Sequence, residues 1–302
     1  MTIFSRFAKI GIPVAAAILT GSALGNKRRG ILTASAATVD SEYSQKDSFL
    51  TAEDLPDVEK PYNGFPRNKW DNNWDNRDPV GMVHYEHLKA AKSEEERKTL
   101  IKKKKPVAVR NIFLVRHAQY HIDSKKKDLT PLGREQAALL GKRLAASGKK
   151  FDILYMSTMA RATETAQIML TEMDPVQTCS DSLLEEGAPY PPEPPSRTWH
   201  PAQHVISLNF FAEGSRIEAA FRKYIHRADP KQEKDSYEII VCHGNVIRYF
   251  ICRALQFPPE GWLRFSLGNT SITWLIVKPS GRVIVRTIGD IGHLPENKTT
   301  FT

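Results

Sequence analysis

Short apolar runs alternate with amphipathic stretches along the chain from residue 106 onward. Runs rich in apolar and β-branched residues predict five strands, at 111–115, 151–156, 237–242, 271–277 and 282–288. Helical patterns separate most of these strands, from residue 131 and at 161–173, 217–226 and 245–255. This alternation predicts an α/β fold with a mostly parallel central sheet between two helical layers, a three-layer α/β/α sandwich.

Turn and capping signals mark the borders of these elements. Thr130 is a good N-cap and Pro131 suits the first position of a helix, so a helix begins there. The segment 183–201 is rich in proline and predicts a surface loop. The Pro-Ser-Gly turn at 279–281 predicts that the last two strands form a hairpin.

The N-terminal segment has a different composition. Residues 1–39 contain no Asp or Glu, and residues 10–25 are uncharged. Because a bilayer-spanning helix needs about 20 apolar residues, the stretch 7–25 predicts an N-terminal transmembrane helix. The alternative is a presequence that is cleaved near the small residues at 35–37. The lack of acids, with basic and serine residues present, also suits mitochondrial targeting.

Three zones follow from these patterns. Residues 1–29 form a membrane anchor or targeting segment, residues 30–105 a polar linker, and residues 106–302 a compact domain. The charged stretch 92–98 within the linker predicts a short exposed helix.

Composition and charge exclude several classes of protein. The chain has 302 residues, of which 41% are hydrophobic and 25% charged, which is typical of a globular core. The formal charge of +9 comes partly from short lysine and arginine runs, and no nucleic-acid-binding module accompanies them. Three cysteines do not form a disulfide framework, and no Cys/His spacing predicts a metal site or a cofactor.

Polar residues follow three of the predicted strands. The first strand ends at Arg116-His117, the second is followed by Arg161 at the start of a helix, and the third ends at His243. The carboxyl ends of parallel strands meet at one edge of a sheet, so these side chains are expected to converge. Guanidinium groups and helix N-termini bind phosphate, which makes this edge a predicted phosphate site.

A neutral imidazole in such a site can attack phosphorus, so His117 is the candidate nucleophile. Arg116, Arg161 and His243 would stabilise the charge on the phosphoryl oxygens. A leaving alkoxide needs a proton from a nearby carboxylic acid, and the adjacent pair Glu185 and Glu186 is the best candidate.

Each of these residues also has a structural interpretation. An Arg-His pair after a strand is usually an ordinary surface pair, and His243 before a glycine could cap a helix. Arg161 could brace its helix, and the two glutamates could be solvated. The joint arrangement of all four segments is what favours a catalytic site.

The motifs carry a resemblance to the histidine phosphatase (phosphoglycerate mutase-like) superfamily. They are Leu114-Val-Arg-His117, Ser157-x-x-x-Arg161-Ala-x-Glu-Thr-Ala166, Glu186 and Val241-Cys-His-Gly244. The resemblance implies the three-layer α/β fold, a phosphohistidine mechanism without metal, and Glu186 rather than Glu185 as the acid. Ala118 stands where the family commonly has glycine, a change that leaves the chemistry in place.

A closer resemblance is to the mitochondrial Ser/Thr-protein phosphatases within that superfamily. It is carried by segments such as His117-Ala-Gln-Tyr-His121 and the run 253–264. This resemblance implies phosphorylated proteins as substrates and a single-pass location in a mitochondrial membrane, with the outer membrane favoured. The adaptor-binding segment of vertebrate relatives is not found after residue 75, which leaves that partner open.

The same resemblance covers the Trp-Asp-x-x-Trp-Asp segment at 70–75. In that group it is a multimerisation motif, which implies a homo-oligomer through Trp70, Asp71, Trp74 and Asp75. Without the resemblance, the segment could be an exposed turn. Two exposed tryptophans flanked by aspartates are more easily understood as docking anchors.

The sequence is compatible with three functions, which its features favour to different degrees. The first is a membrane-anchored protein phosphatase without phosphoglycerate mutase activity, and the second is a small-molecule mutase. Metabolic mutases carry a longer basic insertion before the second histidine, whereas residues 187–242 show little basic lid, which favours the phosphatase. The third, a non-catalytic scaffold, is disfavoured by the complete set of catalytic residues.

Overall fold

The computed structural model describes residues 69–196 and 203–301, which belong to one compact unit. The predicted membrane span at 7–25 lies outside these residues. Within the described ranges, no helix is both long and apolar enough to cross a membrane.

A six-stranded mixed sheet forms the centre of the fold, with the strand order β3-β2-β4-β1-β5-β6. The strands are β1 (Arg110–Arg116), β2 (Ile153–Ser157), β3 (Gln177–Asp181), β4 (Ser236–Cys242), β5 (Ile272–Val277) and β6 (Val283–Asp290). The first four are parallel, while β5 is antiparallel to β1 and β6 is antiparallel to β5. The predicted mostly parallel sheet and its terminal hairpin are therefore confirmed.

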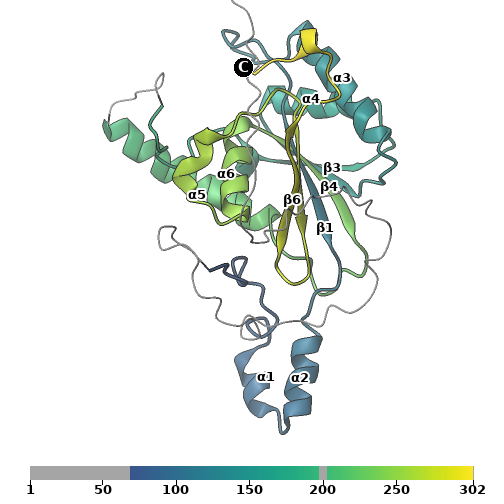
Figure 1. Cartoon of the computed structure of the whole chain (residues 1–302), viewed down its shortest axis with the longest axis vertical. Coiled ribbons are helices and arrows are strands. Elements are labelled where there is room, and N and C mark those ends of the chain that lie inside the picture. Colours follow the sequence, from purple (N-terminus) through teal and green to yellow (C-terminus); the bar gives the residue numbers. More distant parts are fainter. Residues whose placement is uncertain (1–68, 197–202, 302) are drawn as a thin grey trace, which may run out of the picture. The chain divides into compact units, whose positions relative to one another are not determined.

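Helices cover both faces of the sheet (Figure 1). The α-helices are α1 (Tyr85–Ala90), α2 (Glu94–Lys102), α3 (Pro131–Ala145), α4 (Ala160–Leu170), α5 (Gln203–Tyr224) and α6 (Gly244–Ala254). Short 3-10 helices are η1 (Ser182–Leu184), η2 (Pro259–Arg264) and η3 (Glu296–Lys298). Apolar residues of α3 and α4 pack on one face, and those of α5 and α6 on the other.

The two largest buried clusters of apolar residues, one on each face of the sheet, explain why the chain folds into these layers. Alternate residues of β1 point to opposite faces, so Ile112 and Leu114 contact the α5–α6 side. Phe113 and Val115 contact the α3–α4 side. A strand buried on both faces carries a long apolar run, and the run at 112–115 made β1 recognisable in the sequence.

Several elements differ from the sequence prediction, and one of them is α1, an unpredicted helix within the predicted polar linker. β3 was not predicted, because Gln177–Asp181 is polar and exposed, as an edge strand can be. The helix predicted at 217–226 begins much earlier, and α5 starts at Gln203. The helix predicted at 92–98 is present as α2, where the Ser93 side chain accepts from the backbone N–H of Glu96 at 3.1 Å.

The segment 70–75 packs against the domain. The centre of the Trp74 ring lies 5.9 Å from the centre of the Phe221 ring, and its Nε1 donates to the Gly281 carbonyl at 2.7 Å. Asp75 forms a buried ion pair with Arg227. The expectation that both tryptophans are exposed is therefore wrong for Trp74, whereas Trp70 is 37% exposed.

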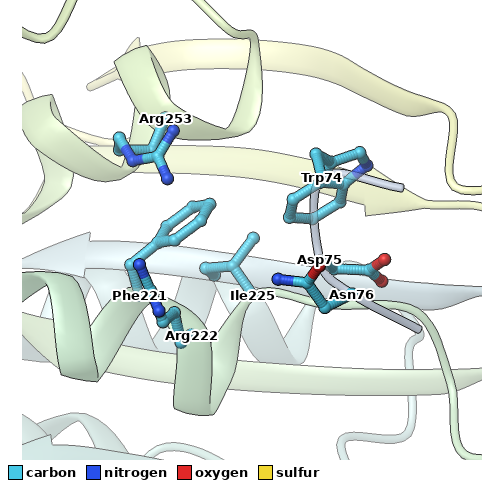
Figure 2. Close-up of a pocket in the computed structure, with 7 residues that line it drawn as sticks. All are labelled: Trp74, Asp75, Asn76, Phe221, Arg222, Ile225 and Arg253. Carbon is cyan, nitrogen blue, oxygen red and sulfur yellow. The ribbon is translucent and has the colours of Figure 1, made fainter. Parts of the chain in front are cut away.

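A cavity of about 290 Å³ lies beside Trp74. Figure 2 shows the segment that carries Trp74 and Asp75 on one side, and Phe221 of α5 with Ile225, just after the end of that helix, on the other. The guanidinium of Arg253 from α6 completes the lining in this view. None of the candidate catalytic residues lines this cavity, so it is a structural feature separate from the predicted phosphate site.

Candidate active site

The candidate nucleophile, His117, directly follows β1 at the carboxyl edge of the parallel strands. Its backbone N–H donates to the Cys242 carbonyl at 2.9 Å, which extends the pairing of β1 with β4. Its carbonyl accepts from the Asn269 side chain at 3.1 Å. The residue is 2% exposed. Its place at the end of β1 and its contacts with β4 and with the segment before β5 hold it in position.

Hydrogen bonds define the tautomer of the His117 ring. Nδ1 lies 2.8 Å from the Ala118 carbonyl oxygen, which can only accept, so Nδ1 carries the proton. Nε2 is then the basic nitrogen, and it accepts from Nε of Arg161 at 3.2 Å. Burial, and then the charge of Arg116, lower the pKa of His117 well below its ordinary value. The ring is therefore neutral at physiological pH, with its lone pair directed at a guanidinium.

Arg161 is in the first turn of α4, just beyond the end of β2. The residue is 8% exposed, and its guanidinium carbon lies 4.8 Å from the centre of the Tyr120 ring. The same tyrosine meets the His117 ring edge-on at 5.2 Å. Thr165 accepts from the Ala118 backbone N–H at 3.0 Å, which ties α4 to the loop after His117. Arg161 and His117 are thus positioned by a common set of contacts.

His243 immediately precedes α6, at the carboxyl end of β4. Its ring centre is 5.1 Å from that of His117, and its Nε2 lies 2.8 Å from the Ser157 hydroxyl oxygen. The side chain is fully buried, and Nδ1 has no hydrogen-bond partner among the described residues. Burial lowers the pKa of His243 well below its ordinary value, and the charge of the neighbouring Arg161 adds to this effect.

Arg116 supplies a second guanidinium next to the two histidines. Its Nη1 donates to the Leu267 carbonyl at 2.6 Å, and Gly244 approaches its Nε so closely that a Cβ there would lie at 3.4 Å. Burial lowers the pKa of Arg116 to about 10, against the opposing effect of the Glu186 charge. Since that value is well above neutrality, the group stays cationic.

The two adjacent glutamates occupy different surroundings. The Glu185 carboxylate accepts from the Thr158 hydroxyl. The Glu186 carboxylate accepts from the Gly187 backbone N–H at 3.2 Å and is acted on by the charges of Arg161 and Arg116. Burial nevertheless raises the pKa of Glu186 above its ordinary value. Glu186 therefore combines a raised pKa with the influence of both arginines.

The structure therefore brings together the residues that the sequence placed at the ends of three strands. Arg116, His117, Arg161, His243 and Glu186 act on one another through hydrogen bonds, ring contacts or charge. The strand order β2-β4-β1 explains this, because the three strand ends are neighbours in the sheet. Among residues 69–196 and 203–301, no cluster of side chains that could hold a metal ion is found.

Sequence reasoning missed two residues of this site. Tyr120 packs on both His117 and Arg161, and its position three residues after the nucleophile was the only available signal. Arg248 lies one turn into α6, and its charge acts on Arg116 and Glu186. Its place four residues after Gly244, on the same helix face, could have indicated it.

Comparison with known proteins agrees with this site. The family model described as histidine phosphatase superfamily (branch 1) matches residues 112–288. The chain belongs to the histidine phosphatase superfamily. The resemblance drawn from the motifs, and the expectation of a phosphatase, are thereby confirmed.

Relatives extend the similarity beyond the catalytic domain. The chain is 52% identical over 302 residues to a Caenorhabditis elegans protein named serine/threonine-protein phosphatase Pgam5, mitochondrial, covering 99% of each chain. It is 51% identical over 234 residues to human serine/threonine-protein phosphatase PGAM5, mitochondrial, covering 76% of this chain and 80% of the relative. A solved phosphoglycerate mutase from Plasmodium falciparum has 34% identity and a TM-score of 0.44, and covers 63% of this chain and 96% of its own.

Proposed function

We propose that this protein hydrolyses phosphoserine and phosphothreonine in proteins through a phosphohistidine intermediate on His117. The observation that carries the proposal is the neutral His117 ring, whose Nε2 lone pair faces Arg161 beside a second arginine and a second histidine. Covalent catalysis of this kind divides a difficult displacement into two easier ones.

In the first step, Nε2 of His117 attacks phosphorus and the bond to the serine oxygen breaks. Arg116 and Arg161 bind the equatorial phosphoryl oxygens, where charge must be stabilised in the transition state. The unpartnered Nδ1 of His243 is a further group that a phosphoryl oxygen could satisfy, with the Ser157 hydroxyl donating to Nε2. The serine alkoxide leaves with a proton from the Glu186 carboxyl group.

In the second step, water attacks the phosphohistidine. Glu186, now ionised, accepts a proton from this water, and phosphate leaves as His117 regains its neutral form. Glu186 is preferred over Glu185 because burial raises its pKa and because it is the glutamate on which both arginines act. A carboxyl group must be protonated in one step and ionised in the next, so a raised pKa favours this cycle.

The substrate class rests on the relatives. Those with 51–52% identity are named serine/threonine-protein phosphatases, which supports a phosphorylated protein over a small phosphate ester. The test offers a phosphoserine peptide, a phosphothreonine peptide and 3-phosphoglycerate to the full chain. Phosphate release from the peptides, without conversion of phosphoglycerate, is expected. Conversion of phosphoglycerate alone would establish the mutase instead.

We further propose that the protein is a homo-oligomer held at a mitochondrial membrane, the outer one favoured, with residues 7–25 as a single-pass anchor. The relatives' names support the organelle, and the exposed Trp70 supports an assembly contact through the segment 70–75. Replacing both Trp70 and Trp74 by alanine should reduce the oligomer size in light scattering. An unchanged size would refute the contact.

A further inference from the structure

The loop that carries Glu186 is held by side chains of α5. Arg216 of this helix donates from Nη1 to the carbonyls of Leu183 and Glu185, at 2.9 and 2.7 Å. Its Nη2 donates to the carbonyl of Glu186 itself, at 3.0 Å. One planar guanidinium therefore determines the backbone path directly through the candidate acid.

A second side chain of α5 holds the other side of the acid. Glu213, three residues before Arg216 and so on the same helix face, accepts from the Ala188 backbone N–H at 2.5 Å. The loop and the helix also approach closely at two glycines. A Cβ on Gly187 would lie 2.8 Å from Nη2 of Arg216, and one on Gly214 would lie 2.5 Å from the Pro189 carbonyl oxygen.

The contacts made by Arg216 are to backbone carbonyls, not to the Glu186 carboxyl group. They leave the carboxyl group free to face Arg116 and Arg161 and to exchange a proton. The charge of Arg216 also reaches the phosphate site, since it contributes to the lowered pKa of His243. Arg216 thus holds the backbone of Glu186 by hydrogen bonds and acts on His243 through its charge.

From these contacts we propose that Arg216, assisted by Glu213, is a positioning residue for the catalytic acid. This inference rests on the proposed role of Glu186 in protonating the leaving group. A displacement of a catalytic group by about 1 Å can slow a reaction on the order of 100-fold. Loss of the contacts that Arg216 makes with the loop should therefore reduce the rate even in a variant that folds normally.

The test compares two leaving groups in the first turnover, with enzyme in excess. A serine alkoxide needs a proton from the acid, whereas p-nitrophenolate leaves without one. Arg216→Met should slow phosphoryl transfer from a phosphoserine peptide about 100-fold, and transfer from p-nitrophenyl phosphate less than about 3-fold. A general structural defect would slow both substrates equally, and that result would overturn the proposal.

A double variant tests whether Arg216 acts through Glu186. Glu186→Gln should show the same dependence on the leaving group, and adding Arg216→Met to it should cause little further loss. If the two losses multiply, Arg216 does not act through the acid and the proposal is wrong. If Glu186→Gln itself slows both substrates equally, the assignment of the acid in the proposed function fails instead.

Two further variants control for folding. Arg222 is on the same helix and forms an exposed ion pair with Glu218, so Arg222→Met should leave both rates within about 3-fold. Arg216→Lys keeps the charge but loses the planar fork, so it should fold and show an intermediate, leaving-group-dependent loss. Wild-type rates in Arg216→Lys would show that the three carbonyl contacts are unnecessary.

Discussion

At the scale of single residues, the chemistry depends on two groups whose pKa values move in opposite senses. Burial and the Arg116 charge lower the pKa of His117, so that its lone pair is available to attack phosphorus. Burial raises the pKa of Glu186, so that its proton is available to the leaving group. Both shifts come from the same low-dielectric surroundings, which penalise the charged form of either residue.

The pH profile of kcat/KM follows from these shifts. His117 must be neutral and Glu186 protonated in the free enzyme, so activity with a phosphoserine peptide should persist well below pH 6.5. As pH rises, kcat/KM should decline when Glu186 loses its proton, and this basic limb should begin above the ordinary Glu pKa of 4.5. Steady-state rates between pH 4.5 and 9 would show this. An acidic limb centred at 6.5 would mean that His117 titrates as a solvent-exposed histidine.

The basic limb can be assigned with one variant. Glu186→Gln cannot lose a proton, so it should lack that limb and have kcat reduced by about 100-fold or more. Glu185→Gln is the matched control, because its carboxylate accepts from Thr158 and should have a small effect on rate. A reversal of these two results would make Glu185 the acid.

At the scale of elements, the segment 70–78 is joined to the domain by a buried ion pair. The Asp75 and Arg227 side chains are 1% and 4% exposed, and Arg227 also donates to the Asn72 carbonyl at 3.0 Å. Arg227 and its hydrogen bonds to Asp75 lower the pKa of that carboxyl group, against the effect of burial. The segment is thus fixed by polar contacts as well as by the Trp74 ring.

Removal of one partner of the Asp75–Arg227 ion pair should lower the stability of the folded protein. Asp75→Ala leaves the Arg227 charge buried and unpaired, which should lower the free energy of unfolding by about 3 kcal/mol. Chemical denaturation followed by circular dichroism measures this loss. Asp123→Ala, at an exposed loop position, should change stability by less than about 0.5 kcal/mol. Equal stability of both variants would show that the pair contributes nothing.

The sequence predicted those elements whose surroundings resemble an average protein interior. β1 and β4 each contain an unbroken apolar run, at 112–115 and 239–242, because both faces of the sheet are covered there. Thr130 caps α3 by accepting from the Gly133 backbone N–H at 2.9 Å, as expected. β3 escaped notice because edge pairing with β2 requires no apolar residues. The packing of Trp74 depends on Phe221 and Gly281, more than a hundred residues away, and no local pattern encodes that contact.

The candidate site was largely predictable because its residues follow strand ends. Arg116-His117 and His243 are recognisable once β1 and β4 are placed side by side. Tyr120 and Arg248 had only their spacing from His117 and Gly244 as a signal, and Arg216 had none, because its role depends on how its side chain reaches from α5 to another segment. The contacts that these three residues make are determined by tertiary geometry.

At the scale of the whole molecule, partly buried histidines that stay neutral make the folded state sensitive to acid. The pKa values of His226 and His293 are lowered to about 4, mainly by burial. The unfolded chain binds protons near pH 6.5, so it takes up more protons than the folded chain between pH 6.5 and 4. The stabilisation is therefore complete above pH 6.5 and is lost as pH falls through that window.

Thermal melting should show the effect directly. The Tm is expected to decrease steadily from pH 6.5 to 4.5, with His226 contributing on the order of 2 kcal/mol after allowance for its partial exposure. His226→Gln should flatten this dependence, whereas His121→Gln, at an exposed position, should not. A Tm that is constant over the window would contradict the lowered pKa values.

The most direct test of the account is to trap the phosphoryl group on the enzyme. The full chain, mixed with a phosphoserine peptide and quenched within one turnover at alkaline pH, should yield an acid-labile phosphoryl group on the fragment that contains His117. His121→Ala, four residues away and exposed, should retain this label. His117→Ala should lose both the label and phosphate release while keeping the wild-type Tm within a few degrees. Phosphate release at the wild-type rate from His117→Ala, or a label on another residue, would contradict the mechanism.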